Sequence, residues 1–147
     1  MIQLRSVTKK YKNNKYALKN VNLDISSGEF VFLVGKSGAG KSTLMKLLYR
    51  EELPSSGTVI IGGINIANLP NDKVPSLRRC MGIVFQDYKL LQNQSVYDNI
   101  AYVIRTMGIS SKEINARVTG ALKVVGLLDK MKAKPSELSG GEQQRVS

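Results

Sequence analysis

Apolar residues of the chain occur in short unbroken runs that predict β-strands. Residues 30–34 are five consecutive apolar side chains between Gly28 and Gly35, a pattern typical of a strand buried on both faces of a parallel sheet. Residues 81–85 form a similar strand-like run, and residues 57–63 form a β-branched run that ends in glycines. The runs therefore predict a sheet whose inner strands are covered on both faces.

The start of the chain predicts two further β-strands. Residues 2–7 and 18–24 are expected to be strands, and residues 12–15 are expected to form the turn between them.

Helical spacing of apolar residues occurs in two places. Leu44, Leu47 and Leu48 recur at i, i+3 and i+4, so a helix is expected to begin near Lys41. The segment from about residue 87 to 135 is expected to be helical. One apolar face lies there between a Ser110 cap and a Gly126 stop, and it comprises Ile114, Val118, Ala121, Leu122 and Val125.

A glycine-rich loop between the first apolar run and the first helix carries the strongest chemical signal. Gly35, Gly40, Lys41 and Ser42 fit the pattern G-x-x-x-x-G-K-[ST], which binds the phosphates of a nucleotide triphosphate. Glycines let the backbone N–H groups face an anion, and the helix N-terminus adds a partial positive charge. Lys41 is expected to reach the β- and γ-phosphates, and the Ser42 hydroxyl to ligate Mg²⁺. The predicted ATP-binding loop is Gly35, Lys36, Ser37, Gly38, Ala39, Gly40, Lys41, Ser42 and Thr43.

A second glycine-rich segment lies near the end of the chain. It consists of Leu138, Ser139, Gly140, Gly141, Glu142 and Gln143. Ser139 and Glu142 have the spacing of an ordinary capping box, which would explain them without any ligand. Two glycines in a first helical turn reduce helix stability, however, and they suit a helix start whose backbone N–H groups contact a phosphate.

Composition is compatible with one globular domain that crosses no membrane. The chain has 147 residues, 42% of them hydrophobic, and no apolar stretch approaches the length of a membrane span. Cys80 is the only cysteine, which excludes an intramolecular disulfide. The formal net charge of +11 comes without a nucleic-acid-binding signature, so we expect no nucleic-acid partner. The basic surface is either simply solvated or in contact with anionic lipid.

Together the two glycine-rich segments resemble the ATP-binding-cassette (ABC) ATPases, and the likeness covers the whole chain. This implies an α/β fold of the phosphate-loop NTPase type: an ABC nucleotide-binding domain with an N-terminal antiparallel β part and an inserted helical subdomain. It divides the single domain, residues 1–147, into a β-rich core at 1–86, a helical subdomain at 87–135 and a signature segment at 136–147. It also implies that this signature contacts the nucleotide held by a second copy, in an ATP-dependent head-to-tail homodimer.

Two isolated residues gain a role from the same resemblance. Tyr11 resembles the aromatic residue that stacks on adenine, although a lone tyrosine is more often a packing residue. Gln86 resembles the glutamine that senses Mg²⁺ and the attacking water, although a glutamine after a strand is often only a solvated loop residue. With Ser42, Gln86 completes the implied metal site.

Within the family, three stretches look like the FtsE-type cell-division ATP-binding proteins of bacteria: residues 74–79, 85–91 and 96–101. Residues 48–52 are similar to what Gram-positive members carry after the first helix. Lipoprotein-release, macrolide-export and methionine-import ATPases share parts of them and remain alternatives. The resemblance implies a peripheral subunit at the cytoplasmic face of the membrane, at the division site, with an FtsX-like integral membrane partner. Leu90, Leu91 and Tyr97 are candidates for the partner-coupling surface, or else ordinary core residues.

The family also has features that this sequence lacks. Its Walker B aspartate, catalytic glutamate and switch histidine follow the signature, and the chain contains no histidine. We therefore expect no catalytic residue within these 147 residues. Two interpretations remain: a truncated ATPase, or a short nucleotide-binding module that does not hydrolyse ATP.

Overall fold

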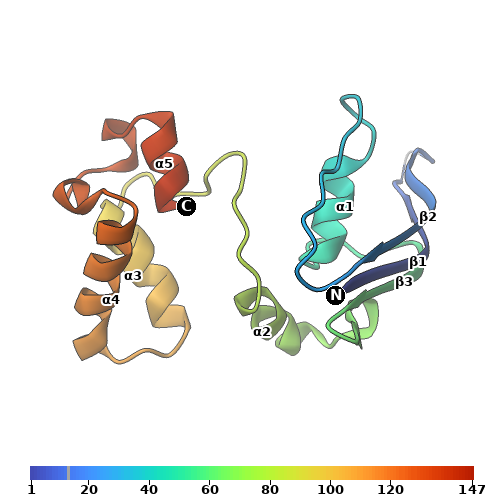
Figure 1. Cartoon of the computed structure of the whole chain (residues 1–147), viewed down its shortest axis with the longest axis horizontal. Helices are drawn as coiled ribbons and strands as arrows, with labels where there is room; N and C mark the ends of the chain where they lie inside the picture. The colour runs from blue at the N-terminus through green and yellow to red at the C-terminus, as the bar shows by residue number, and fades with distance from the viewer. Residues whose placement is uncertain (13) are drawn as a thin grey trace. The chain divides into compact units, whose positions relative to one another are not determined.

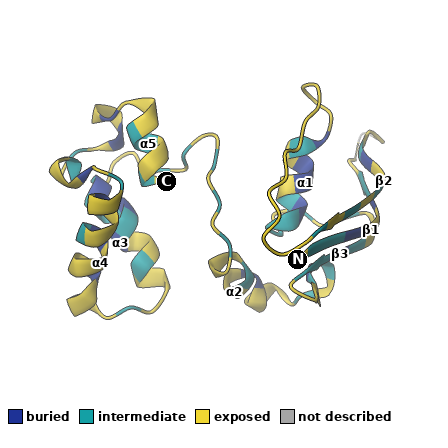
Figure 2. Ribbon diagram, in the orientation of Figure 1, coloured by how far each residue is buried: buried dark blue, intermediate teal, exposed yellow. Residues whose placement is uncertain are grey.

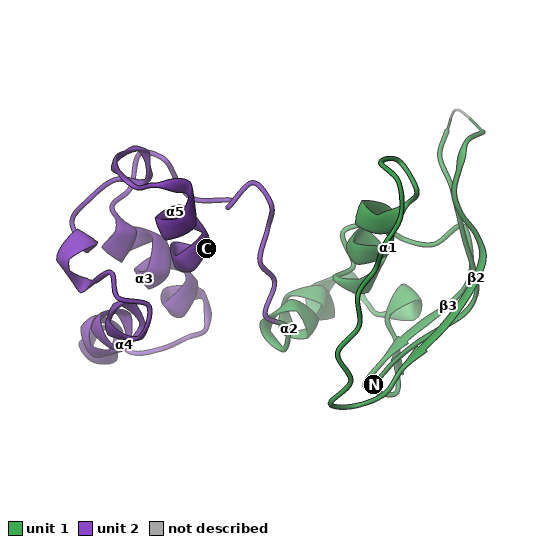
Figure 3. Cartoon of the chain, turned by 45° about the horizontal axis from the view of Figure 1, so that its top comes forward, with its two compact units in different colours: residues 1–81 green, residues 82–147 purple. Residues whose placement is uncertain are grey.

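The computed structural model describes residues 1–12 and 14–147. They form two compact units, residues 1–81 and residues 82–147, shown separately coloured in Figure 3. Asn13, within the turn predicted at 12–15, lies outside the described residues. On either side of it, the Tyr11 amide donates to the Lys15 carbonyl (3.0 Å) and the Asn14 amide to the Tyr11 carbonyl (2.9 Å).

The first unit contains a four-stranded antiparallel sheet with strand order β2-β1-β3-β4. Its strands are β1 (Ile2–Lys10), β2 (Tyr16–Ile25), β3 (Ser56–Ile61) and β4 (Ile64–Asn65). The strands predicted at 2–7, 18–24 and 57–63 are thus confirmed, the first two longer than expected.

Two helices and two short 3₁₀ turns complete the first unit: α1 (Lys41–Leu48), η1 (Ile66–Asn68), η2 (Asn71–Lys73) and α2 (Val74–Arg79). Helix α1 lies beside the sheet (Figure 1), and its Leu44 and Leu47 are buried in one core with residues of the strands. This confirms the helix predicted from their spacing. Since removal of apolar surface from water is the main favourable term in folding, this contact holds α1 against β2 and β3. The core of the unit comprises Leu4, Val7, Leu18, Leu44, Leu47, Val59 and Ile66.

The second unit is helical, with α3 (Val96–Thr106), α4 (Ser111–Val124), η3 (Leu128–Lys130), η4 (Pro135–Glu137) and α5 (Gly140–Val146). Ile114, Val118 and Leu122 of α4 are buried as predicted, but Ala121 is exposed. Residues 87–95 contain no helix, so the helical segment begins later than expected. Ser110 precedes α4, but its hydroxyl bonds the Glu113 carboxylate (2.7 Å) and caps no backbone N–H.

The strands predicted at 30–34 and 81–85 are wrong for this structure. Neither run belongs to a strand, and all five side chains from Phe30 to Val34 are exposed (Figure 2). A strand buried on both faces requires hydrogen-bonded neighbours and covering layers, and no strand of the described residues lies beside either run. The hydrophobic pattern therefore identified segments suited to a sheet that is not formed here.

Candidate functional site

The predicted phosphate loop leads directly into α1. Residues 26–39 are exposed, whereas Gly40 is buried where the helix begins. Gly40 has φ of 92°, and a Cβ there would lie 2.3 Å from the Ala17 carbonyl oxygen and 3.0 Å from the Leu18 side chain. Both the positive φ and this close approach to β2 require glycine.

The start of α1 is suited to an anion. No side chain caps the helix, and its first turn contains no acidic residue. The backbone N–H groups of a first turn have no intrahelical partners and carry the positive end of the helix dipole. An uncapped start beside a glycine-rich loop therefore offers several donors to a phosphate group.

Lys41 lies across the loop. Its Nζ donates to the carbonyl oxygens of Gly35 (2.6 Å) and Lys36 (2.9 Å), which holds the ammonium over the beginning of the loop. Ser42 is exposed next to it, and no hydrogen bond to its hydroxyl is found in the part of the chain that the structure describes. A hydroxyl oxygen is a hard ligand of the kind that Mg²⁺ takes, so Ser42 fits the predicted metal-binding role.

The structure brings Tyr11 to the same place. Its hydroxyl lies 3.3 Å from Thr43 Oγ1, in the first turn of α1, and donates to Glu52 Oε1 (2.9 Å). Sequence reasoning missed Glu52, since nothing in a local pattern connects residues 41 positions apart.

The signature segment has the local geometry predicted for it. Ser139 Oγ accepts the Glu142 amide (3.3 Å) and the Ser139 amide donates to the Glu142 carboxylate (2.7 Å), which confirms the capping box before α5. The hydrogen bond from the Ser139 side chain lowers the pKa of the Glu142 carboxyl. Glu142 is thus engaged with its own helix start.

Tyr88 is a second residue that sequence reasoning missed. A Cβ on Gly140 would lie 3.1 Å from the Tyr88 hydroxyl, so the signature glycine lets the two segments approach. Tyr88 and Lys89 are consecutive non-glycine residues with positive φ, 56° and 55°, and such backbone strain is concentrated at functional sites.

This contact predicts the effect of adding one methyl group to the signature. Gly140→Ala is expected to lower the melting temperature, because overpacking typically costs about 1–3 kcal/mol and exceeds the ~1 kcal/mol gain in helix propensity. In a Tyr88→Phe background the same change should instead raise it, since the hydroxyl is gone. Thermal unfolding of the four proteins tests this, with Gly141→Ala as the control, where a Cβ meets only Arg145 at 3.9 Å. Destabilisation that is equal in both backgrounds would contradict the contact.

Gln86 is exposed in a turn of the second unit, beside an ion pair between Asp87 and Lys89 (2.6 Å). Ser42 belongs to the first unit. Their joint role at a metal therefore stays a prediction.

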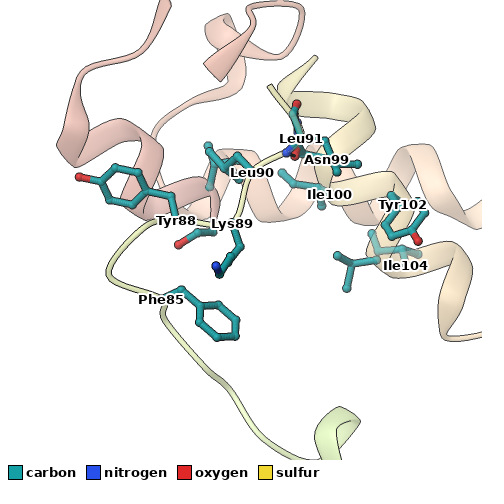
Figure 4. A pocket seen from close by; sticks show the side chains of 12 residues that line it. Phe85, Tyr88, Lys89, Leu90, Leu91, Asn99, Ile100, Tyr102 and Ile104 are labelled. Atoms are coloured by element: carbon teal, nitrogen blue, oxygen red, sulfur yellow. Dashed lines mark hydrogen bonds between the residues drawn. The ribbon is translucent and has the colours of Figure 1, made fainter. Parts of the chain in front are cut away.

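Leu90 and Leu91 line a groove of about 390 Å³ in the second unit (Figure 4). Tyr97 instead packs, half-buried, against that unit's core. Asn99, which sequence reasoning missed, is buried and holds the groove wall: its Oδ1 accepts the Leu91 amide (2.7 Å), and its Nδ2 donates to the Ser95 carbonyl (2.9 Å). The exposed Leu91 and the half-buried Leu90 thus lie beside a hydrogen-bonded wall.

The ABC transporter family model matches residues 18–147. The chain therefore belongs to the ABC transporter family, as the two glycine-rich segments predicted. Among the described residues, no helix is long and apolar enough to cross a membrane.

Curated relatives of the chain include proteins named cell division ATP-binding protein FtsE. The protein of Streptococcus pneumoniae strain D39 is 46% identical over 147 residues, and the match covers all of this chain and 64% of the relative. That of Escherichia coli K12 is 49% identical over 146 residues, covering 99% of this chain and 66% of the relative. The chain thus spans about two thirds of the length of these relatives.

Solved structures show the same fold. The ATP-binding cassette MJ0796, a dimer in a post-hydrolysis state bound to ADP and Pi, matches with a TM-score of 0.89 and 38% identity over 99% of this chain and 66% of that one. CbiO1 of Clostridium perfringens, part of the ABC transporter complex cbiONQ, matches with a TM-score of 0.84 and 31% identity over 99% of this chain and 58% of that one. The predicted ABC nucleotide-binding-domain fold, with its antiparallel N-terminal sheet, is confirmed.

Proposed function

We propose that this chain is the nucleotide-binding part of an FtsE-type subunit, which couples ATP binding and hydrolysis to a membrane partner in bacterial cell division. The uncapped, acid-free start of α1 behind the buried Gly40, with Lys41 across the loop, carries the ATP assignment. The names of the relatives support the cell-division role. The residues of the phosphate loop would bind the triphosphate, and Ser42 would hold a Mg²⁺ that neutralises its charge, with Gln86 as the second ligand expected from the sequence.

None of these residues is proposed as the general base. Phosphoryl transfer to water depends mainly on positioning and charge neutralisation, and Lys41 and the loop N–H groups provide both for the phosphates. Residues 1–147 thus bind and orient the nucleotide.

The partner in this proposal is an FtsX-like integral membrane protein at the division site. The groove beside Leu90 and Leu91 supports a coupling surface, because its apolar wall is exposed and held by Asn99. Lysines exposed around the β1–β2 turn, among them Lys10, Lys12 and Lys19, support an additional contact with anionic lipid.

A genetic experiment tests the cell-division assignment. Depletion of the protein should produce division-defective cells, and an affinity-tagged copy should co-purify with an integral membrane protein from detergent extracts. The Leu91→Asp variant should no longer co-purify with that membrane protein. The Val124→Asp variant, which changes an exposed residue of α4, should still co-purify with it. Normal division after depletion would contradict the proposal.

A second test concerns the head-to-tail dimer in which the signature contacts the nucleotide of the other copy. Ser139→Arg should prevent ATP-driven dimerisation and leave ATP binding by the monomer nearly unchanged, because it adds bulk and charge at the start of α5. Size-exclusion chromatography with ATP, in a hydrolysis-blocked background, gives the readout. Ser95→Arg is the control, since Ser95 caps α3 in the same way (3.1 Å to the Asp98 amide). If the Ser139→Arg variant still forms dimers with ATP, Ser139 serves only as a helix cap and does not contact the nucleotide of the other copy.

A further inference from the structure

Three side chains meet beside the first turn of α1 in the first unit. Lys9 lies in β1, and Tyr11 is the first residue after that strand. Glu52 lies shortly after the end of α1. Each carboxylate oxygen of Glu52 has one partner: Oε2 lies 2.8 Å from Lys9 Nζ, and Oε1 accepts the Tyr11 hydroxyl at 2.9 Å. Glu52 therefore joins the two residues of the strand end.

This arrangement is shielded from solvent and electrostatically compensated. The side chains of Lys9 and Glu52 are 15% and 21% exposed, and Lys9 Nζ also donates to the Leu53 carbonyl (2.8 Å). The hydrogen bond from Lys9 is the main cause that lowers the pKa of the Glu52 carboxyl, so Glu52 stays ionised at neutral pH. A pair that is largely removed from water and hydrogen-bonded on both sides holds its geometry more firmly than an exposed one.

The same contacts fix the ring of Tyr11. Lys9 Nζ lies over the ring, 5.2 Å from its centroid, which covers one face. The hydroxyl is tied to Glu52 and lies 3.3 Å from Thr43 Oγ1. Although the ring is fixed at one face and at its hydroxyl, Tyr11 is still exposed. A flat apolar group can therefore stack on the remaining face, close to the phosphate loop.

We propose that Glu52 and Lys9 are positioning residues that hold Tyr11 as a stacking platform for the base of the bound nucleotide. This inference rests on the proposed function of the loop as an ATP site. Glu52 bonds the Tyr11 hydroxyl and Lys9 lies over the Tyr11 ring, so both should affect affinity only for ligands that carry a base. The Lys9 ammonium on one face of the ring should also strengthen stacking of the base on the other face, because it withdraws electron density from the ring.

A comparison of two ligands, each with Mg²⁺, distinguishes the contribution of the base to affinity from that of the phosphates. ATP carries a base, and inorganic tripolyphosphate does not. In the protein as its gene encodes it, Glu52→Gln should weaken ATP binding about tenfold, the lower end of what an aromatic–base stack contributes. Tripolyphosphate binding should be unchanged. Asp24→Asn is the matched control, because Asp24 pairs with Arg5, also on β1, and it should change neither affinity.

Each outcome of this experiment is decisive. Equal losses for ATP and tripolyphosphate would mean that Glu52 only supports the fold of the loop, and an unchanged ATP affinity would also overturn the proposal. In a Tyr11→Ala background Glu52→Gln should have no further effect on ATP binding. If the Glu52→Gln variant does not fold, Tyr11→Phe removes the same hydrogen bond by deleting its donor. Its affinities for ATP and tripolyphosphate are then compared in the same way. If the wild-type protein binds neither ligand, the proposed ATP site itself is wrong.

Discussion

Lys41→Ala is expected to weaken ATP binding by about 100-fold or more. The substitution removes the ammonium that lies across the loop, 2.6 and 2.9 Å from two loop carbonyls. From there it can reach the β- and γ-phosphates, and hydrogen bonds to charged groups contribute about 1.5–3 kcal/mol each. Two such bonds correspond to about two orders of magnitude or more in affinity. Titration with a fluorescent ATP analogue measures the change.

Lys46→Ala provides the matched control for Lys41→Ala. It removes the same charge from the same helix, but Lys46 pairs with Glu51 (3.1 Å) near the other end of α1. Its affinity for ATP should stay close to that of the wild type. Lys41→Ala should weaken the binding of tripolyphosphate as well as that of ATP, whereas Glu52→Gln should weaken only the binding of ATP. Wild-type affinity in Lys41→Ala would remove Lys41 from the site.

Features set by neighbouring residues could be predicted from the sequence. The start of α1 at Lys41 and the capping box at Ser139 depend on contacts within one helical turn, and the structure has both. The strands β1, β2 and β3 also followed from local patterns, because each is long and pairs with a neighbour in the same unit. The family followed from two motifs whose combination is rare.

Features that depend on distant partners could not be predicted. The run at 30–34 has the composition of a central strand, but composition does not provide the neighbours that a strand requires. Glu52 reaches Tyr11 across the unit, and Tyr88 approaches Gly140 from another loop. Glu52 and Tyr88 have no motif of their own, so only the structure connects them to the predicted site residues.

The exposed apolar run at 30–34 is expected to determine how the chain behaves in solution. The 147-residue chain, expressed on its own, is expected to aggregate and to release no phosphate from ATP. Phe30 is 82% and Val34 85% exposed, and the whole run is an uncharged, proline-free segment of aromatic, β-branched and aliphatic residues. Its backbone forms no hydrogen bond with the backbone of the other described residues. Segments of this kind pair with copies of themselves. Sedimentation and phosphate release, measured on freshly purified chain, are the readouts.

Substitution of a single residue distinguishes this cause from general instability. Phe32→Lys places a charge in the middle of the run, which should keep most of the chain in the supernatant because a charge opposes stacking of identical segments. Val124→Lys should not, although Val124 is 88% exposed, because it is a single apolar residue on α4 and not part of a run. If both variants remain as insoluble as the wild-type chain, the run at 30–34 does not cause the aggregation. A soluble, cooperatively melting chain that hydrolyses ATP would contradict both the aggregation mechanism and the absence of a general base from residues 1–147.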